Sequence, residues 1–328
     1  MTTYTSVTVT HRGGLDAVAV LDRPLRDPEP GEARIRVITA PVCQDDVAIR
    51  IGNRPFLRKP PFVPGYAFIG VVDAVGEGVT DVSVGDRVTA LTQFDSHAEV
   101  IYRPQGELAP VPDELDPVRA APLVLNYLVA QQVLHRVAHV ERGQSVLVIG
   151  ASGGVGTAFL DLARLAGLRA YGTASPRKHP VVAGYGATPI DYRSGDLVAA
   201  VRRHEPDGVD LVVNGMGPEY LSDGLAALRR GGRLVAYGAP QGLGALAVLI
   251  GRLVATNVTP NGKRIIGYGT HREGVTSFKE DWATLFELLG RRQIEPLVAG
   301  TYPLRRARDA YARLESGSVA GTLVLTVP

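Results

Sequence analysis

The chain has 328 residues, about twice the usual length of one domain, so two domains are expected. Hydrophobic residues make up 45% of it and charged residues 21%, as in ordinary globular proteins. The 35 basic and 33 acidic side chains leave a net charge of only +2. This charge argues against a protein that binds nucleic acid by neutralising phosphates.

Three further features narrow the class of protein. The one cysteine, Cys43, excludes an intramolecular disulfide framework and a zinc site built from several thiolates. The N-terminal sequence MTTYTSVTVT has neither the basic start nor the apolar core of a signal peptide. The longest apolar stretches are far shorter than the ~20 residues that span a bilayer. We therefore expect a soluble, cytoplasmic protein with no membrane and no nucleic-acid partner.

The first hundred residues predict short strands separated by turns. Side chains alternate between two faces in VTVTH, AVAVLDR and ARIRVIT, and the pattern continues at Gly70–Val75 and Arg87–Ala90. The intervening PLRDPEPGE and GEGVTDVSVGD are rich in turn-forming residues. Strands this short and closely spaced indicate a compact all-β unit, a barrel or a sandwich.

The pattern changes near residue 120, where Ala120–His135 is apolar and predicts a helix. Beyond it, predicted strands alternate with helices, among them a helix at Thr157–Ala166. The strands are expected at Ser145–Ile149, Arg169–Thr173, Leu211–Asn214, Arg233–Tyr237 and Arg264–Tyr268. Such alternation predicts an α/β fold with a doubly wound parallel sheet. The tail predicts helices at Ser277–Arg291 and Leu304–Ser316, and strands at Val298–Tyr302 and Thr322–Val327.

The most specific motif is the glycine-rich turn in SVLVIG-ASGGVG-TAFLDLARLAG, between a buried strand and a helix. Glycine is needed there because a side chain would block a pyrophosphate from approaching the turn and the first helical amides. A turn in this context predicts dinucleotide binding. The expected contacts in the turn are Gly150, Ser152, Gly153, Gly154, Val155 and Gly156.

The next strand indicates which dinucleotide binds. An NAD-preferring site usually places an acid at the end of this strand to accept the ribose hydroxyls, but here the strand ends at Ala174. Hydroxyl, cationic and phenol groups follow instead, at Ser175, Arg177, Lys178, Tyr192 and Arg193. A 2′-phosphate needs such donors, so NADP(H) is the expected cofactor. Asn214 and Gly238 complete the predicted cofactor contacts.

Several sequence blocks occur in an order found in one family. They are EPGEARIRV, CQDDVAIRIGN, PPFVPGYAFIGVVDAVGEGV, VGDRV, GASGGVG, VDLVVNGMG and LRRGGRLVAYG. Over nearly its full length the chain resembles a medium-chain dehydrogenase/reductase of the zinc-free quinone oxidoreductase (zeta-crystallin-like) branch. The resemblance implies a GroES-like β-barrel catalytic domain built from residues 1–122 and 270–328. A Rossmann NADP(H)-binding domain, residues 123–269, is then inserted between the two parts.

Departures from the zinc-dependent members of the superfamily suggest a chain without zinc. Cys43 and Asp46 stand where those enzymes have a cysteine ligand and its CxxD partner. Their His-Glu pair after the PG turn is replaced by Gly65, Tyr66 and Ala67. A lone thiol lacks the three protein ligands that catalytic zinc needs, so no metal is expected.

The chemistry that the resemblance implies is direct hydride transfer from the nicotinamide to an electron-poor carbon or a quinone ring. Tyr66 and Asp46 are the candidate catalytic residues, Tyr66 as donor to the substrate oxygen. Alternatively, Tyr66 fills the space left by zinc, Asp46 is a local backbone acceptor, and Cys43 is a small buried hydrophobe. The candidate substrate-binding residues are Cys43, Asn53, Arg54, Asn126 and Tyr127.

The leading hypothesis is a zinc-independent, NADPH-dependent reductase of a quinone or α,β-unsaturated carbonyl compound. One alternative is an enoyl-thioester reductase, which a basic docking patch would favour; Arg50, Arg54, Arg58 and Lys59 are its candidates. Another is a non-catalytic NADPH-binding protein. The low lysine content suggests a GC-rich genome, and from this source we infer a role in polyketide-type secondary metabolism.

The apolar strand Arg264–Tyr268 predicts a homodimer, because it can pair edge-to-edge with its symmetry mate. The run Gly244–Pro260 either caps the substrate site or lies at a subunit interface.

Overall fold

The structure of the chain is a computed structural model that describes residues 2–53, 58–193, 195–238, 242–260, 262–270 and 274–327. The chain forms two compact units. The terminal unit comprises Met1–Leu125, Trp282–Arg292 and Pro296–Pro328, and the inserted unit comprises Asn126–Asp281 and Gln293–Glu295. The chain therefore enters the inserted unit twice and returns to the terminal unit each time. Its second stay in the inserted unit is only three residues long.

The described part of the terminal unit is built on two sheets. A hairpin joins β1 (Thr3–Val9) to β2 (Val18–Pro24). The larger sheet has the order β14-β15-β3-β4-β5-β7, and β6 also pairs with β3. Its strands are β3 (Glu32–Val42), β4 (Ala67–Val75), β5 (Arg87–Leu91), β6 (Val100–Pro104), β7 (Ala109–Pro110), β14 (Val298–Pro303) and β15 (Thr322–Thr326). Both ends of the chain thus contribute to one sheet.

Alternation in the sequence explains the core of this sheet. In β3, Ala33, Ile35 and Val37 point inward and join an apolar cluster with Phe68 of β4 and Val88 of β5. The strands predicted in the first hundred residues are confirmed as β1 to β5. The strands β6 and β7 were not predicted, since β7 is too short to show an alternating pattern.

The helices of the terminal unit are short, apart from one that crosses into the inserted unit. They are α1 (Gln44–Arg50), α2 (Pro117–Pro122) and α10 (Ala307–Glu315), together with the later part of α9 (Gly274–Gly290). The start of α2 follows from its sequence, because Asp116 accepts a hydrogen bond from the amide of Val118 and Pro117 takes the first turn.

The inserted unit contains a six-stranded parallel sheet of order β10-β9-β8-β11-β12-β13. Its strands are β8 (Ser145–Ile149), β9 (Arg169–Ala174), β10 (Thr188–Asp191), β11 (Val209–Asn214), β12 (Leu228–Ala236) and β13 (Arg264–Gly267). This is the strand order of a doubly wound dinucleotide-binding sheet, and the predicted α/β class is confirmed.

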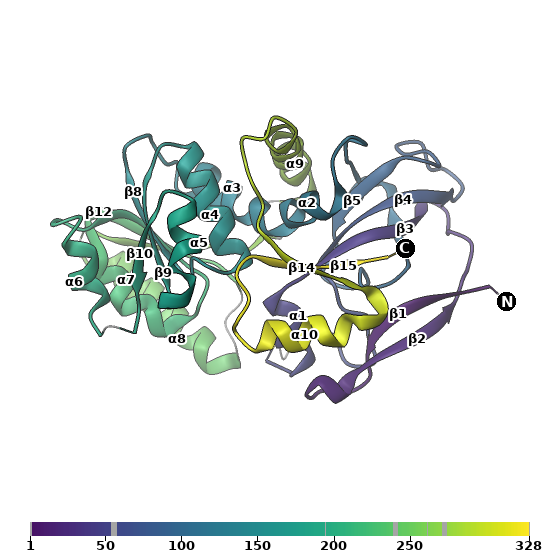
Figure 1. Ribbon diagram of the computed structural model, residues 1–328, viewed down its shortest axis with the longest axis horizontal. Coiled ribbons are helices and arrows are strands. Elements are labelled where there is room, and N and C mark those ends of the chain that lie inside the picture. Colours follow the sequence, from purple (N-terminus) through teal and green to yellow (C-terminus); the bar gives the residue numbers. More distant parts are fainter. Residues whose placement is uncertain are drawn as a thin grey trace. The chain divides into compact units, whose positions relative to one another are not determined.

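Helices cover both faces of this sheet (Figure 1). On one face α4 (Gly154–Leu165) and α5 (His179–Gly184) pack on β8, β9 and β10. On the other, α6 (Leu197–Arg202), α7 (Leu221–Ala227) and α8 (Gly242–Val258) share one apolar cluster with the strands. No helix in the described ranges is both long and apolar enough to cross a bilayer.

One strand of the parallel sheet was not predicted, and two predicted helices differ in their bounds or internal geometry. The strand β10 was not predicted; it has four residues, and its Pro189 is tolerated because β10 is an edge strand. The helix expected from Thr157 begins at Gly154, so two motif glycines lie in its first turn. The helix expected at Ala120–His135 is present as a continuous helical stretch from Pro117 to Val137, in which α2 and α3 (Leu128–Gln131) alternate with two π-helical segments, Leu123–Tyr127 and Gln132–Val137.

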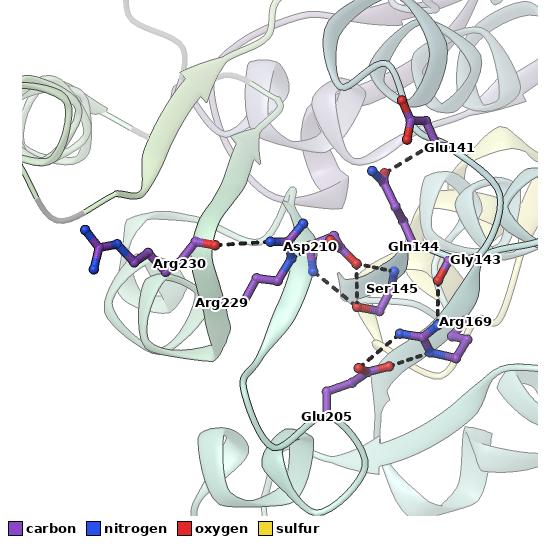
Figure 2. A network of polar contacts seen from close by, with 9 residues as sticks. All are labelled: Glu141, Gly143, Gln144, Ser145, Arg169, Glu205, Asp210, Arg229 and Arg230. Carbon is purple, nitrogen blue, oxygen red and sulfur yellow. Dashed lines mark hydrogen bonds and ion pairs between the residues drawn. The ribbon is translucent and has the colours of Figure 1, made fainter.

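A polar network ties together the amino ends of the strands (Figure 2). The carboxylate of Asp210 accepts hydrogen bonds from the amide and hydroxyl of Ser145 at 2.7 and 3.0 Å, and from Arg229 at 2.5 Å. Arg169 forms an ion pair with Glu205 at 2.7 Å. These contacts fix the strand starts at the edge of the sheet opposite to the glycine-rich turn.

Candidate cofactor and active site

The predicted cofactor contacts gather at the carboxyl edge of the inserted sheet. Gly150 follows β8, Ser175 follows β9, Tyr192 follows β10, and Asn214 ends β11. Gly238 lies just after β12. In this strand order β8 and β11 are neighbours whose connections leave in opposite directions, which is where open parallel sheets bind ligands.

The glycine-rich turn has the close backbone packing that a dinucleotide site requires. Gly150 has φ +80°, a conformation that favours glycine. A Cβ on Gly156 would come within 2.3 Å of the carbonyl oxygen of Gly150 and 2.7 Å of the backbone of Ala151. The helix can therefore approach the strand end only because residue 156 has no side chain.

The start of α4 offers donors to an anion. Gly153 is the N-cap residue and has no side chain with which to cap the helix. The first amides of an α-helix lack intrahelical partners and carry the positive end of its dipole, and here they belong to Gly154, Val155 and Gly156. These residues and the adjoining Ser152 fit the pyrophosphate of a dinucleotide.

The segment after β9 has the charge that a 2′-phosphate needs. Ser175 is followed by a short 3₁₀ turn, Pro176–Lys178, in which Arg177 is exposed and Lys178 half-buried. Burial lowers the pKa of Lys178. The end of β10 lies alongside, with Asp191 opposite Ala174, so Tyr192 and Arg193 emerge beside this turn.

The turn after β11 contains Met216, which contacts the glycine-rich turn although nothing in the sequence indicates this. Asn214 shapes this turn: its side chain donates to the carbonyl of Gly217 at 2.8 Å and accepts from the amide of Met216 at 2.9 Å. The sulfur of Met216 lies 2.7 Å from where a Cβ on Gly150 would be. Only the neighbouring positions of β8 and β11 reveal this contact.

In the terminal unit, a buried carboxylate organises the second group of predicted residues. Asp46 accepts hydrogen bonds from the amide of Cys43 at 2.9 Å, from the Cys43 thiol at 3.2 Å, and from the amide of Gly65 at 3.0 Å. The first bond closes a capping box at the start of α1. The carboxylate thus serves as a local backbone acceptor, one of the two roles considered for it.

Burial also sets the acid–base properties of these groups. It raises the pKa of the Cys43 thiol well above its usual value, and the carboxylates of Asp46 and Asp45 raise it further. Burial raises the pKa of Asp46 as well, while nearby His97 and the accepted hydrogen bonds oppose the rise. The thiolate is therefore disfavoured at neutral pH.

His97 is fully buried beside this group. Its Nε2 lies 3.1 Å from the carbonyl oxygen of Pro41, which can only accept, so this nitrogen carries the proton. Its Nδ1 lies 2.7 Å from the hydroxyl oxygen of Tyr311, within hydrogen-bond distance. In the part of the chain that the structure describes, no three His, Cys, Asp or Glu side chains are arranged to hold a metal ion.

Tyr66 lies in a packed apolar environment. Its ring belongs to a cluster with Ile49, Phe62 and Phe94, and Cys43 packs against that cluster. Such surroundings suit an aromatic residue that fills space, and the role of Tyr66 as a donor stays a prediction.

The other predicted substrate contacts are differently placed. Asn53 closes the end of α1, with its amide donating to the carbonyl of Ala48 at 2.9 Å. Arg54 lies outside the described residues. Asn126 and Tyr127 end the π-helical segment, and Tyr127 donates its hydroxyl to the buried carboxylate of Asp161 at 2.8 Å. Burial and this carboxylate raise the pKa of Tyr127 far above its usual value.

The basic patch considered for a carrier substrate loses one member. Arg50 is buried, forms an ion pair with Glu315 at 2.5 Å, and donates to the carbonyl of Gly13 at 2.6 Å. Arg58 forms an ion pair with Asp95 at 2.9 Å. Arg50 is therefore a structural residue, because its guanidinium is committed to partners inside the unit.

Two family models match the sequence. The alcohol dehydrogenase GroES-like domain matches residues 29–113, and the zinc-binding dehydrogenase family matches residues 185–325. The first match lies within the terminal unit, where the expected GroES-like domain is thereby confirmed.

The chain is also similar to individual proteins over most of its length. It is 30% identical to the synaptic vesicle membrane protein VAT-1 homolog of Danio rerio, over 99% of this chain and 70% of that protein. It is 30% identical to a 2-haloacrylate reductase from Burkholderia sp, over 96% of both. It is 28% identical to the quinone oxidoreductase of Pongo abelii, over 91% of this chain and 90% of that protein. Among solved structures, mycobacterial Rv1454c complexed with NADPH has a TM-score of 0.87 at 30% identity, covering 98% of this chain and 99% of that one.

Proposed function

Because this chain belongs to the medium-chain dehydrogenase/reductase superfamily, in its zinc-free quinone oxidoreductase-like branch, we propose that it is a zinc-independent, NADPH-dependent reductase of quinones or α,β-unsaturated carbonyl compounds. The observation that carries this proposal is the glycine-rich turn at the carboxyl edge of the inserted sheet, next to a strand that ends without an acid. NADPH, when bound, supplies a hydride to the substrate.

The preference for NADPH rests on the segment after β9. Arg177 and Lys178 provide two cations beside Ser175, and Arg193 adds a third from the neighbouring strand end. A dianionic 2′-phosphate gains charge-assisted hydrogen bonds from such a set, whereas the free hydroxyl of NADH does not. Similarity to a structure solved with NADPH supports this preference.

The proposed acceptor is an electron-poor double bond or a quinone ring. The relatives include a quinone oxidoreductase and a reductase named for a halogenated acrylate, whose double bond is conjugated to a carboxyl group. In such a reaction the protein orients the acceptor and donates to the oxygen that gains charge. We assign the donor role to Tyr66, with Asp46 holding the amide of Gly65 that precedes it.

An enoyl thioester is a less favoured substrate within this proposal. A long acyl carrier needs a basic surface for docking, and the buried Arg50 cannot contribute to one. A non-catalytic NADPH-binding protein is the second alternative. It stays open because similarity to a VAT-1 homolog does not by itself indicate that the chain catalyses a reaction.

We further propose a homodimer that forms through the β13 edge of the inserted sheet. β13 pairs only with β12 among the described strands, and α8 packs against it. The outer face of α8 exposes large apolar side chains in one stripe, including Leu243, Ile250 and Val254. An unpaired strand edge next to an apolar helix face is suited to association with a second copy.

One assay separates these alternatives. Oxidation of NADPH is followed with a para-quinone, an ortho-quinone, a simple enone and crotonyl thioester as acceptors. The proposal predicts turnover with a quinone or the enone. Turnover with crotonyl thioester alone would favour the carrier-linked reaction, and tight NADPH binding without turnover would favour the non-catalytic protein.

A further inference from the structure

A buried carboxylate on α4 lies outside the sites described so far. Asp161 is 1% exposed and accepts three hydrogen bonds. Its Oδ2 accepts from the Tyr127 hydroxyl at 2.8 Å and from the Glu295 amide at 2.6 Å, and its Oδ1 accepts from Arg164 at 2.8 Å. Two of the three donors, Tyr127 and Glu295, thus come from parts of the chain outside α4.

Two of these donors lie where the chain passes between its units. Tyr127 is the second residue of the inserted unit after the chain leaves the terminal unit at Leu125. Glu295 ends the three-residue segment that the inserted unit takes from the returning chain. Asp161 therefore holds residues next to two of the four passages on one helix, and that helix begins at the glycine-rich turn.

Two more side chains donate hydrogen bonds to the same returning segment, Gln293–Glu295. Arg164 donates to the carbonyl of Gln293 at 2.6 Å. The hydroxyl of Tyr185 donates to the carbonyl of Glu295 at 2.9 Å. Tyr185 directly follows α5, and α5 directly follows the segment proposed to bind the 2′-phosphate. Arg164 of α4 and Tyr185, the residue after α5, thus both contact the segment Gln293–Glu295.

These hydrogen bonds are costly to break. Hydrogen bonds to an ionised carboxylate are stronger than neutral ones, and a buried carboxylate that loses a donor is left with an unmet desolvation cost. A shift of α4 is therefore expected to move Gln293–Glu295, because only the short side chain of Asp161 lies between the helix and the backbone amide of Glu295.

We propose that Asp161 is a positioning residue of the reductase, which ties two of the four chain passages between the units to the cofactor-binding helix and so couples bound NADPH to the segment of chain that returns to the terminal unit. This inference rests on the proposed function. It assigns Asp161 no contact with substrate or cofactor, and its effect is on the rate of hydride transfer once both are bound.

Three variants test the inference, and a fourth is the matched control. Asp161→Asn removes one acceptor, while Tyr127→Phe and Tyr185→Phe each remove one hydroxyl and keep the ring. The control is Tyr171→Phe, which removes a hydroxyl that donates to Glu205 at 2.9 Å, at the opposite edge of the sheet. Figure 2 shows Glu205 in that network, paired with Arg169.

For Asp161→Asn we expect kcat to fall by about tenfold or more, since small misplacements of reacting groups are costly in rate. The Kd for NADPH, measured by fluorescence, should stay within about twofold, because α4 keeps its glycine turn and first amides. The two Tyr→Phe variants at Tyr127 and Tyr185 should show smaller losses of the same kind. The control should match the wild type.

Hydrogen exchange provides a readout that does not depend on turnover. In the wild type, NADPH should slow exchange of the Glu295 amide, and in Asp161→Asn this slowing should be lost. Unchanged kcat in all three variants, or equal NADPH-dependent protection of Glu295 in wild type and Asp161→Asn, would overturn the inference alone. If the wild type does not bind NADPH at all, the proposed function itself fails. Should Asp161→Asn not fold, the two tyrosine variants carry the same comparison.

Discussion

The carboxylate of Asp46 accepts a hydrogen bond from the backbone amide of Gly65, with 3.0 Å between Oδ1 and nitrogen. This bond joins the start of α1 to the turn that precedes Tyr66, although the two residues are 19 positions apart. The predicted proton donor therefore depends on the carboxylate for its backbone position. Asp46 and Tyr66 act as one structural group in the account given above.

If Tyr66 donates to the substrate oxygen, Tyr66→Phe should lower kcat and kcat/KM together while NADPH affinity is unchanged. General-acid assistance is typically worth about 10²–10⁴-fold, so an enone substrate should approach such a loss. With a quinone, kcat should fall by only roughly a few-fold, because the reduced form is aromatic and needs less help from a donor. Steady-state kinetics on both acceptors measure the difference. Unaltered kinetics on both would show that Tyr66 only fills space in its apolar cluster.

The 2′-phosphate is expected to give NADPH at least a tenfold lower Kd than NADH, a difference of about 1.4 kcal/mol. Replacing Arg177 and Lys178 together by Ala should remove most of this preference by raising the Kd for NADPH and leaving that for NADH unchanged. Arg203→Ala, an exposed arginine that follows α6, is the control. Equal dissociation constants for the two cofactors in the wild type would contradict the assignment.

The raised pKa of Cys43 predicts slow alkylation of the folded protein. Thiolate is the reactive form, so the rate with iodoacetamide should still be rising at pH 10, where an ordinary thiol with a pKa of about 8.5 is almost fully ionised. Asp46→Asn removes the neighbouring negative charge, which should lower the pKa of the thiol and speed alkylation at pH 8. Mass spectrometry of timed samples gives both rates. A rate that levels off near pH 7 would show that the thiol is acidic, contrary to its environment.

The proposed dimer should be sensitive to charge on the outer face of α8. Val254 is 53% exposed there, and Val254→Glu should shift the protein to a monomer at micromolar concentration. Val84→Glu is the matched control, because Val84 is 62% exposed but lies in the terminal unit. Light scattering coupled to gel filtration reports the mass of each. A monomeric wild type would exclude the dimer.

Local patterns in the sequence predict most of the parallel sheet. The buried run at Ser145–Ile149 is confirmed with the same ends, because five apolar or small residues bounded by polar and glycine residues have few other solutions. The glycine motif likewise identifies the turn, since close packing at Gly156 requires that residue type. The strand β10 escapes prediction because four residues with a proline carry too little pattern.

Contacts between distant residues could not be predicted in this way. Arg50 has the sequence context of a surface basic residue. In the structure it is buried, and its partner Glu315 is 265 positions away in the sequence. The bond from Tyr127 to Asp161 and the approach of Met216 to Gly150 depend equally on which strands are neighbours. Strand order is a property of the whole fold, and a single sequence without relatives contains little information about it.

Hydride transfer from the cofactor to the acceptor can be followed directly with an isotope. NADPH carrying deuterium at the transferable C4 position is mixed with the wild type and an enone, and the reduced product is analysed by mass spectrometry and NMR. We expect one deuterium on the β-carbon of the saturated ketone and equal turnover with and without a chelator. A product that contains no deuterium from the cofactor, or activity that chelator abolishes and zinc restores, would contradict the proposed function.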